Sequence, residues 1–313
     1  MSLAFVFPGQ GAQTIGMGRD LAEAYPAAQA VFDEVDDALG EKLSALIWEG
    51  EQDELTLTQN AQPALMATSL AAMRALEAEG VSVTDAAFVA GHSLGEYSAL
   101  AAAGAFSIAD TARLLRLRGK AMQAAVPVGV GAMAAVLGLD IDAVRQVAAD
   151  AAEGEVCAAA NDNDPAQVVV SGHKGAVERA AALAKERGAR RALMLPVSAP
   201  FHCSLMAPAA EAMAEALANV EMRDPAVPVV ANVLARPENS AAALSGLLVE
   251  QVTHSVRWRE SVDWMATEGD VTGFWEIGAG KALTGMIRRI AKEAETRAVG
   301  TSADVATALE ARG

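Results

Sequence analysis

The stretch that decides the fold is Ala86-Ala87-Phe88-Val89-Ala90-Gly91-His92-Ser93-Leu94-Gly95, which joins a short apolar run to an alanine-rich segment. A buried strand, a tight turn and a helix in this order form a nucleophile elbow, in which the central serine is exposed at the end of the strand. The flanking glycines allow a strained turn without a Cβ clash, and the helix N-terminus offers free N–H groups to an oxyanion. Ser93 is therefore the candidate nucleophile, although such a string also arises by chance in a chain with 26 glycines.

Short apolar runs alternate with longer helical stretches along the rest of the chain. The pattern predicts strands at 3–7, 88–90, 132–137, 167–171, 192–196, 228–231 and 273–277. It predicts helices over 63–79, 94–103, 108–124, 141–152, 176–187 and 208–217. Such alternation is typical of an α/β protein with a mainly parallel sheet. Because 126–197 shows the element order of a small split β-α-β unit, we expect this segment to be inserted into a larger domain made of 1–125 and 198–313.

Composition and charge narrow the classes of protein. The 313 residues are 52% apolar and 20% charged, which excludes disordered and disulfide-scaffold classes. A formal net charge of −16 repels nucleic acid and anionic lipid, so neither is an expected partner. Two cysteines and the absence of a signal-peptide pattern favour a reducing cytoplasm. Proline and glycines interrupt the charge-free stretch 121–139, which predicts a helix end, a turn and a strand rather than a membrane span.

A serine nucleophile needs a base, and the chain has only four histidines. His92 adjoins the serine and is expected to project to another side of the turn, where it supports the elbow. His173 falls at a predicted helix start, where a surface or capping role is expected. His202 follows the proline-bracketed loop 196–200 at the domain junction, and it comes after the serine in chain order. The residues favour His202 as the base and leave His254 as the alternative; no acid stands out, so a dyad is permitted.

The helix predicted over 108–124 carries one arginine on its apolar stripe. Its other basic residues share a polar face, whereas Arg118 falls with Leu115 and Met122 at helical spacing on the inward side. An inward guanidinium must be paired, because an unpaired buried charge costs several kcal/mol. Arg118 therefore forms an ion pair with a buried acid, extends to the surface, or is available to a substrate carboxylate.

Nucleotide and metal sites are not indicated. The loop 7–13 has Thr14 where a dinucleotide fingerprint needs its third glycine, and the loop 278–281 lacks the residues of a phosphate-binding loop at 275 and 282. No cluster of histidine and carboxylate residues has metal-ligand spacing. We therefore expect no bound cofactor and no metal.

Five motifs together carry a family resemblance. They are Phe7-Pro8-Gly9-Gln10-Gly11, Gly91-His92-Ser93-Leu94-Gly95-Glu96, Leu117-Arg118-Gly119, Gln167-Val168-Val169-Val170-Ser171-Gly172 and Pro200-Phe201-His202. In order and spacing they resemble the malonyl-CoA:acyl carrier protein transacylases of fatty acid synthesis over nearly the whole chain. The resemblance implies an α/β-hydrolase-like parallel-sheet domain with an inserted ferredoxin-like subdomain.

The resemblance also implies roles for the candidate residues. Ser93 corresponds to the nucleophile and His202 to its base. The main-chain N–H groups of Gln10 and Leu94 correspond to the oxyanion hole, and Arg118 to the residue that pairs with the malonyl carboxylate. An acid partner for the histidine is then not required.

Four further positions match the family less directly. Gln251 corresponds to the glutamine whose main-chain carbonyl orients the histidine, while His92 and Asn161 match positions near the active site. Phe201 is typical of malonyl rather than methylmalonyl selectivity. The run 161–165 departs from the commoner Ser-Pro pattern, which changes only the expected shape of a loop.

The implied substrates are malonyl-CoA and the phosphopantetheine thiol of acyl carrier protein, used in ping-pong order through a malonyl-serine by a cytoplasmic monomer. Carrier proteins are generally acidic, so an acidic enzyme needs a local basic patch. The runs 185–191 and 288–292 are the two candidates, and each is equally well explained as a solvated helix face.

Three other functions stay open from sequence. A serine esterase or thioesterase would use the same elbow but release the acid to water, and it would not need Arg118. A polyketide acyltransferase that acts in trans would share every motif and differ in its carrier. A non-catalytic carrier-binding module would not need both Ser93 and His202.

Overall fold

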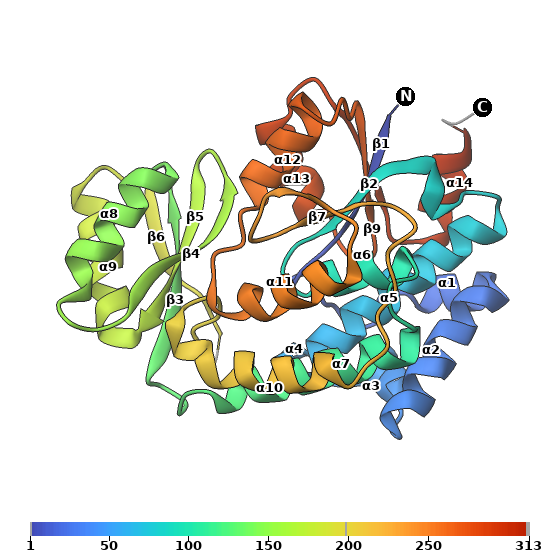
Figure 1. Ribbon diagram of the computed structural model, residues 1–313, viewed down its shortest axis with the longest axis horizontal. Helices are drawn as coiled ribbons and strands as arrows, with labels where there is room; N and C mark the ends of the chain where they lie inside the picture. Colours follow the sequence, from blue (N-terminus) through green and yellow to red (C-terminus); the bar gives the residue numbers. More distant parts are fainter. Residues whose placement is uncertain (1, 198, 311–313) are drawn as a thin grey trace.

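The computed structural model describes residues 2–197 and 199–310, and its centre is a six-stranded sheet (Figure 1). The strand order is β10-β9-β1-β2-β7-β8. The strands are β1 Leu3–Phe7, β2 Ala86–Gly91, β7 Val229–Ala231, β8 Arg236–Glu238, β9 Gly273–Ile277 and β10 Glu295–Val299. All neighbours pair in parallel except β8, which is antiparallel to β7. The prediction of an α/β fold with a mainly parallel sheet is confirmed.

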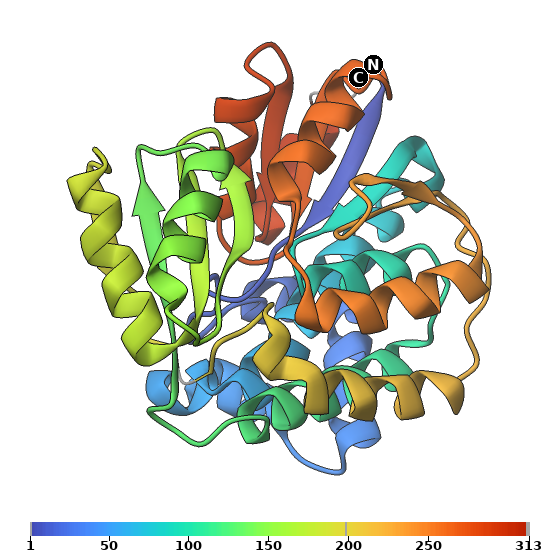
Figure 2. The ribbon, with the colours of Figure 1, turned by 60° about the vertical axis from the view of Figure 1, so that its left-hand side comes forward.

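A second sheet of four antiparallel strands is formed by one continuous segment. Its order is β4-β5-β3-β6, and its strands are β3 Gly131–Leu137, β4 Cys157–Asp164, β5 Gln167–His173 and β6 Arg191–Met194. The helices α8 Ile141–Ala152 and α9 Lys174–Glu186 cover its outer face, away from the large sheet (Figures 1 and 2). The order β-α-β-β-α-β is that of a ferredoxin-like unit, and it adds one strand, β4, to the pattern read from the sequence.

The remaining helices surround the large sheet. They are α1 Arg19–Ala24, α2 Pro26–Leu39, α3 Leu43–Glu49, α4 Gln52–Thr56, α5 Thr58–Ala78, α6 Gly95–Ala102, α7 Ile108–Ala124, α10 Ala207–Ala218, α11 Ala241–Thr253, α12 Trp258–Thr267, α13 Ala282–Ile290 and α14 Ser302–Glu310, with short 3-10 turns at Val83–Asp85 and Ser204–Met206. Among the described helices, none combines the length and apolarity that a membrane crossing requires.

The central strand β1 shows why the sheet is buried on both faces. Phe5 and Phe7 point into the core that contains α2 and α5, whereas Ala4 and Val6 point into a second core with α12 and α13. Alternate residues of a strand point to opposite faces, so a fully apolar strand needs helices on both sides. All five residues of β1 are buried, as this arrangement requires.

Two features of the predicted elements are wrong. The run 161–165 was expected to be a loop, but residues 161–164 belong to β4, which pairs with β5. The helix expected from residue 63 begins at Thr58, with Pro63 inside it. The strands β8 and β10 were also missed, because both are short or partly exposed edge strands with few apolar residues.

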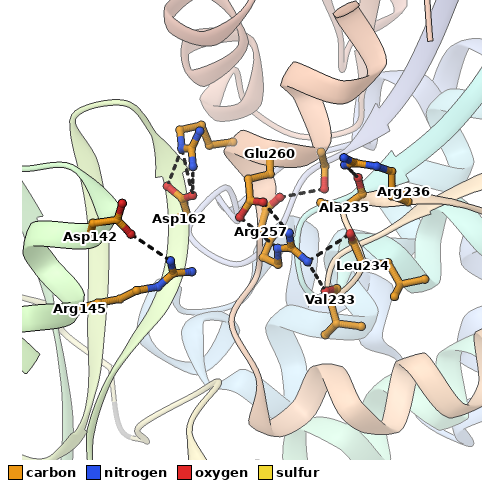
Figure 3. A network of polar contacts seen from close by, with 11 residues as sticks. Asp142, Arg145, Asp162, Val233, Leu234, Ala235, Arg236, Arg257 and Glu260 are labelled. Atoms are coloured by element: carbon orange, nitrogen blue, oxygen red, sulfur yellow. Dashed lines mark hydrogen bonds and ion pairs between the residues drawn. The ribbon is translucent and has the colours of Figure 1, made fainter. Parts of the chain in front are cut away.

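Polar contacts attach the small sheet to the segment that leads into α12. The carboxylate of Asp162 on β4 is 1% exposed and forms an ion pair with Arg259 at 2.9 Å. The main-chain N–H of Asp162 donates to the carbonyl of Val256, whose own N–H donates to Ala160. Figure 3 shows Asp162 beside the ion pair that joins Arg257, just before α12, to Glu260 in its first turn. The edge strand β4 is thus fixed to the segment around α12, and Met133, Ala135 and Val169, on the face of the small sheet opposite α8 and α9, belong to the hydrophobic core that contains the large sheet.

Candidate active site

Ser93 lies in a strained turn directly after β2. Its φ of 54° is in the left-handed region, which residues with a Cβ rarely adopt. A Cβ at Gly91 would come within 1.9 Å of the Gly95 carbonyl, and a Cβ at Gly95 within 2.2 Å of the Phe7 oxygen. Only glycine fits at either position, so the two glycines of the motif allow the sharp turn that presents the Ser93 hydroxyl.

The Ser93 hydroxyl lies against the His202 imidazole. Ser93 Oγ is 2.7 Å from His202 Nε2, and His202 Nδ1 is 2.8 Å from the main-chain oxygen of Gln251. A carbonyl can only accept, so Nδ1 carries the proton and Nε2 is free to accept the serine proton. The contact is a serine–histidine pair whose histidine is oriented by a carbonyl, the arrangement that the resemblance implied.

Burial and a neighbouring charge keep the His202 ring neutral. His202 is 4% exposed, and burial lowers its pKa to about 3, with the positive charge of Arg118 as the next cause. His202 also has a positive φ, 58°. A neutral imidazole at pH 7 is ready to take a proton, and both members of the pair are held in uncommon backbone conformations.

The other three histidines lie apart from the serine hydroxyl. His92 Nε2 is 2.8 Å from Asn163 Oδ1 on β4, so its ring is directed at the small sheet. His173 Nδ1 accepts from the main-chain N–H of Val156 at 2.9 Å, at the end of β5. His254 is exposed at the end of α11, where its ring meets the Glu250 carbonyl. The alternative base His254 is thus not near Ser93.

Arg118 is a buried guanidinium beside the nucleophile. It is 1% exposed, and it donates to Gln62 Oε1 at 2.7 Å, Gln251 Oε1 at 2.8 Å and Ser93 Oγ at 3.2 Å. Within the described residues no carboxylate lies within 4.0 Å of it, and its Nε has no partner. Burial lowers its pKa from the usual value. All hydrogen-bond partners of this buried cation are neutral, so its charge is not balanced by an ion pair. The guanidinium could therefore bind an anionic group.

Glu96, on α6, is the buried acid whose charge acts on Arg118, yet it forms no hydrogen bond or ion pair with Arg118 among the contacts of the described residues. Its Oε2 accepts from Gln251 Nε2 at 2.7 Å and from the Asn232 N–H at 3.2 Å. Burial raises its pKa to about 7, and the hydrogen bonds and the charge of Arg118 oppose that rise. Glu96 therefore positions the Gln251 side chain between itself and Arg118.

A cavity of about 290 Å³ opens over Ser93. Seven further residues that the sequence analysis singled out also line this cavity: Gln10, His92, Leu94, Arg118, Asn161, Phe201 and His202. Phe7 pairs with Gly91 at the carboxyl ends of β1 and β2, which brings the Gln10 loop beside the elbow. The main-chain N–H groups of Gln10 and Leu94 have no acceptor among the residues that the structure describes. Two residues that line the cavity beside the serine thus have main-chain donors without an acceptor among the described residues.

Three buried residues at the site were not singled out from the sequence. Gln62 on α5 accepts from Arg118 and donates to Thr58. Asn232, after β7, accepts from the Ser93 N–H at 2.8 Å and donates to the Gly91 carbonyl. Glu96 was quoted in the motif without a role. Both Gln62 and Asn232 could have been found from the sequence. Gln62 is a polar residue on a mostly apolar helix, and Asn232 directly follows the carboxyl end of a strand.

A metal centre is not apparent in the part of the chain that the structure describes: no three His, Cys, Asp or Glu side chains group in a way that would hold an ion.

Comparison with known proteins places this geometry in a family. A family model described as "Acyl transferase domain" matches residues 4–308. The malonyl CoA-acyl carrier protein transacylase of Escherichia coli strain K12 is 48% identical over 307 residues, which cover 98% of each chain. The protein of the same name from Bacillus subtilis strain 168 is 48% identical over 309 residues, 98% of this chain and 96% of that one.

Solved structures of similar proteins point to the same family. An acyl-carrier-protein-S-malonyltransferase from Bartonella henselae superposes with a TM-score of 0.97 at 55% identity, over 99% of both chains. A malonyl-transacylase solved with a type II polyketide synthase acyl carrier protein gives a TM-score of 0.96 at 45% identity, over 99% of this chain and 100% of that one. The resemblance read from the five motifs is confirmed: this chain belongs to the acyl transferase domain family, among relatives named malonyl CoA-acyl carrier protein transacylases.

Proposed function

We propose that this enzyme moves the malonyl group from malonyl-CoA to the phosphopantetheine thiol of acyl carrier protein in fatty acid synthesis, through a malonyl ester on Ser93. The observation that carries the proposal is the position of the buried Arg118, whose guanidinium contacts the serine hydroxyl and has no anionic partner among the described residues. A serine–histidine pair alone supports any acyl transfer. A cation at 3.2 Å from the nucleophile favours an acyl group that ends in a carboxylate.

In the first half-reaction, His202 Nε2 takes the proton of the Ser93 hydroxyl as Oγ bonds to the thioester carbonyl carbon. The carbonyl oxygen becomes an oxyanion and accepts from the N–H groups of Gln10 and Leu94, each worth about 3 kcal/mol by analogy with other oxyanion holes. The C–S bond then breaks, and the thiolate leaves with the proton that His202 returns. Because Nδ1 donates to the Gln251 carbonyl, the imidazolium formed in between is held without an acid.

In the second half-reaction the phosphopantetheine thiol gives its proton to His202 and attacks the malonyl-serine ester. The ester C–O bond breaks, and Ser93 recovers its proton from His202. Neither half uses a cofactor. The two substrates occupy the same cavity in turn, which gives ping-pong kinetics.

Acyl selectivity follows from the cavity walls. Arg118 pairs with the free carboxylate of the malonyl group, as its open side allows. Phe201, 9% exposed, lines the cavity and fills space that a branched acyl chain would need. Asn161 and His92 line the same cavity from β4 and from the elbow. These contacts favour malonyl over acetyl and methylmalonyl groups.

A polyketide synthase carrier is the second candidate acceptor. It is favoured by one observation: a relative with a TM-score of 0.96 was solved with such a carrier. Both candidates share the chemistry at Ser93 and differ only in the protein that carries the thiol, so comparing transfer rates to the two carriers distinguishes them.

The test is the intact mass of the enzyme after mixing with malonyl-CoA, followed by addition of holo acyl carrier protein. Wild type should gain one malonyl group and lose it to the carrier, whereas Ser93→Ala should gain nothing. Release of coenzyme A with free malonate and no acylated carrier would make the enzyme a hydrolase. Absence of any adduct on wild type would refute the malonyl-serine.

The organisation of the chain also belongs to this proposal. The segments 1–125 and 198–313 form the catalytic domain and 126–197 the inserted unit; the boundary residue 198 lies outside the described residues. Cys157 and Cys203 are both free thiols, which supports a cytoplasmic enzyme. We expect a monomer, since the described residues of one chain complete the site, and size-exclusion chromatography with light scattering tests this.

A further inference from the structure

Thr58, the first residue of α5, is a buried residue without a role in the proposed mechanism. It is 2% exposed, and its Oγ1 lies 3.0 Å from Gln10 Oε1 and 3.0 Å from Gln62 Nε2. Gln10 carries one of the two proposed oxyanion donors, and Gln62 accepts a hydrogen bond from Arg118. Thr58 thus lies between two parts of the site, the donors for the oxyanion and the cation for the carboxylate.

The chemistry of the groups fixes the direction of each hydrogen bond in this series. A guanidinium can only donate, so the Gln62 amide turns its oxygen to Arg118, at 2.7 Å, and its NH2 group to Thr58. The Thr58 hydroxyl therefore accepts from Gln62, and its single proton is left for Gln10 Oε1. The far end of the Gln10 side chain is thus held by a donor whose own orientation is set.

The glycine that follows Arg118 brings α7 against the first turn of α5. A Cβ at Gly119 would lie 2.5 Å from Gln59 Cα and 2.7 Å from the Thr58 carbonyl oxygen. Both are backbone atoms, which cannot move aside as the end of a side chain could, so only glycine fits. The close packing of the two helices fixes the separation that Gln62 spans between Arg118 and Thr58.

The loop that carries Gln10 contains few features that would hold it in place by itself. Gln10 is exposed and lies between two glycines, and Gly11 has a φ of 105°, a region that residues with a Cβ rarely adopt. Within the loop, the Gly11 N–H donates to Gln13 Oε1 at 2.7 Å. The hydrogen bond from Thr58 joins the loop to a long buried helix. A side chain that is bonded at its far end limits the rotation of its own main chain, and therefore the direction of the Gln10 N–H.

We propose that Thr58 is a positioning residue for the oxyanion hole, because its bond to the Gln10 side chain keeps the Gln10 main-chain N–H directed at the thioester carbonyl oxygen. This inference rests on the proposed acyl transfer through Ser93. A preorganised donor stabilises an oxyanion only while its N–H lies where the charge develops. Loss of the Thr58 hydroxyl should therefore slow the chemical step and leave the binding of the acyl donor unchanged.

Two acyl donors separate this role from that of Arg118. An oxyanion forms on every thioester, whereas only the malonyl group has a carboxylate. Thr58→Val should lower the rate of Ser93 acylation by malonyl-CoA and by acetyl-CoA by the same factor, about 10- to 100-fold, with unchanged half-saturating concentrations. Thr58→Ser keeps the hydroxyl and should restore both rates. Arg118→Ala should not copy this pattern, since the bond from Thr58 to Gln10 does not include the guanidinium.

A double-mutant cycle tests whether Thr58 acts through the Gln10 side chain. Gln10→Met keeps the main-chain N–H and removes the amide oxygen, and the exposed position makes the variant independent of folding. Thr58→Val, Gln10→Met and the double variant should show similar losses, because one contact can be removed only once. Losses that multiply in the double variant would overturn the proposal, since the two residues would then act separately.

Thr68→Val is the matched control on the same helix. Thr68 is 0% exposed and donates its hydroxyl to the Ala64 carbonyl at 3.0 Å, so the variant loses a buried hydrogen bond that does not touch the cavity. Both acylation rates should stay at the wild-type value, and a fall in this control would overturn the proposal. A loss with malonyl-CoA alone, or full activity of Thr58→Val, would also overturn it. If wild type forms no malonyl-serine, the proposed function itself fails, which separates the two results.

Discussion

The sharpest consequence of the site concerns Arg118→Ala. The guanidinium is 1% exposed and lies 3.2 Å from Ser93 Oγ, so the malonyl carboxylate would complete an ion pair that is fully shielded from water. Breaking a buried pair by removing one partner costs about 3–5 kcal/mol. At 1.4 kcal/mol per factor of ten, kcat/KM for malonyl-CoA should fall by roughly a hundredfold to a few thousandfold.

The acetyl thioester serves as the internal comparison, because it has no carboxylate to lose. Its transfer to the carrier should not fall in Arg118→Ala. The assay is acylation of holo acyl carrier protein, followed by intact mass, with malonyl-CoA and acetyl-CoA in parallel. Equal losses on both donors would refute the carboxylate role and leave Arg118 as a structural support for the serine.

Two controls keep this result interpretable. Arg113→Ala removes an exposed arginine of the same helix, paired with Asp110, and should change neither activity. Arg118→Ala also leaves the amide oxygens of Gln62 and Gln251 without a donor, at about 1–3 kcal/mol each, while it removes a buried charge. Urea unfolding of the variant therefore shows whether the fold is retained before the rates are compared.

Three further predictions concern pH and the backbone. Since burial lowers the pKa of His202 to about 3, kcat/KM for malonyl-CoA should show no histidine titration from pH 8 to pH 5; an inflection near 6.5 that persists in Glu96→Gln would contradict a shielded imidazole. Burial raises the pKa of Glu96 from 4.5 to about 7, so the folded state binds the extra proton and loses about 3 kcal/mol of stability as pH rises through that window. Glu96→Gln should abolish that fall, measured as the difference in urea midpoints between pH 5 and pH 8. Gly91→Ala should prevent folding of the elbow, since its Cβ would lie 1.9 Å from Gly95. Gly246→Ala, whose Cβ would point into open space on α11, should instead raise the unfolding free energy by about 0.5–1 kcal/mol. Thermal melts of the two variants test both expectations.

The elements that could be predicted from sequence are those whose apolar pattern matches their burial. β1 has the predicted bounds because it is a continuous apolar run, β9 has them because it is apolar apart from Gly273 and Glu276, and α7 has them because Ser107 caps its start. β4 could not be predicted, since its polar residues 161–164 are buried by partners elsewhere in the chain. Asn163 meets His92 and Asp162 meets Arg259, contacts that no local pattern contains.

The site residues also divide into those that the local sequence could predict and those that depend on contacts distant in the chain. Ser93 could be predicted because its strand, turn and glycines are adjacent in sequence. The residues favoured His202 over His254 only modestly, because the chain's return to the elbow depends on packing of the loop that precedes α10; the family motif strengthened that choice. Gln62 and Asn232 act through contacts 56 and 139 residues away in sequence, to Arg118 and Ser93.

Gln251 connects His202, the proposed base, to Arg118, the proposed selectivity residue. Its main-chain oxygen holds His202 at 2.8 Å, and its side-chain oxygen accepts from Arg118 at 2.8 Å. Burial is the largest cause of the low pKa of His202 and the charge of Arg118 is the next, so in the free enzyme the proposed selectivity residue weakens the proposed base. In the proposed complex, a malonyl carboxylate on Arg118 would offset that charge and strengthen the base at the moment of attack, whereas an acetyl group would leave the base weak. The proposed mechanism therefore predicts selection for malonyl in the chemical step as well as in binding, and Arg118→Ala should raise acetyl transfer above wild type while it lowers malonyl transfer.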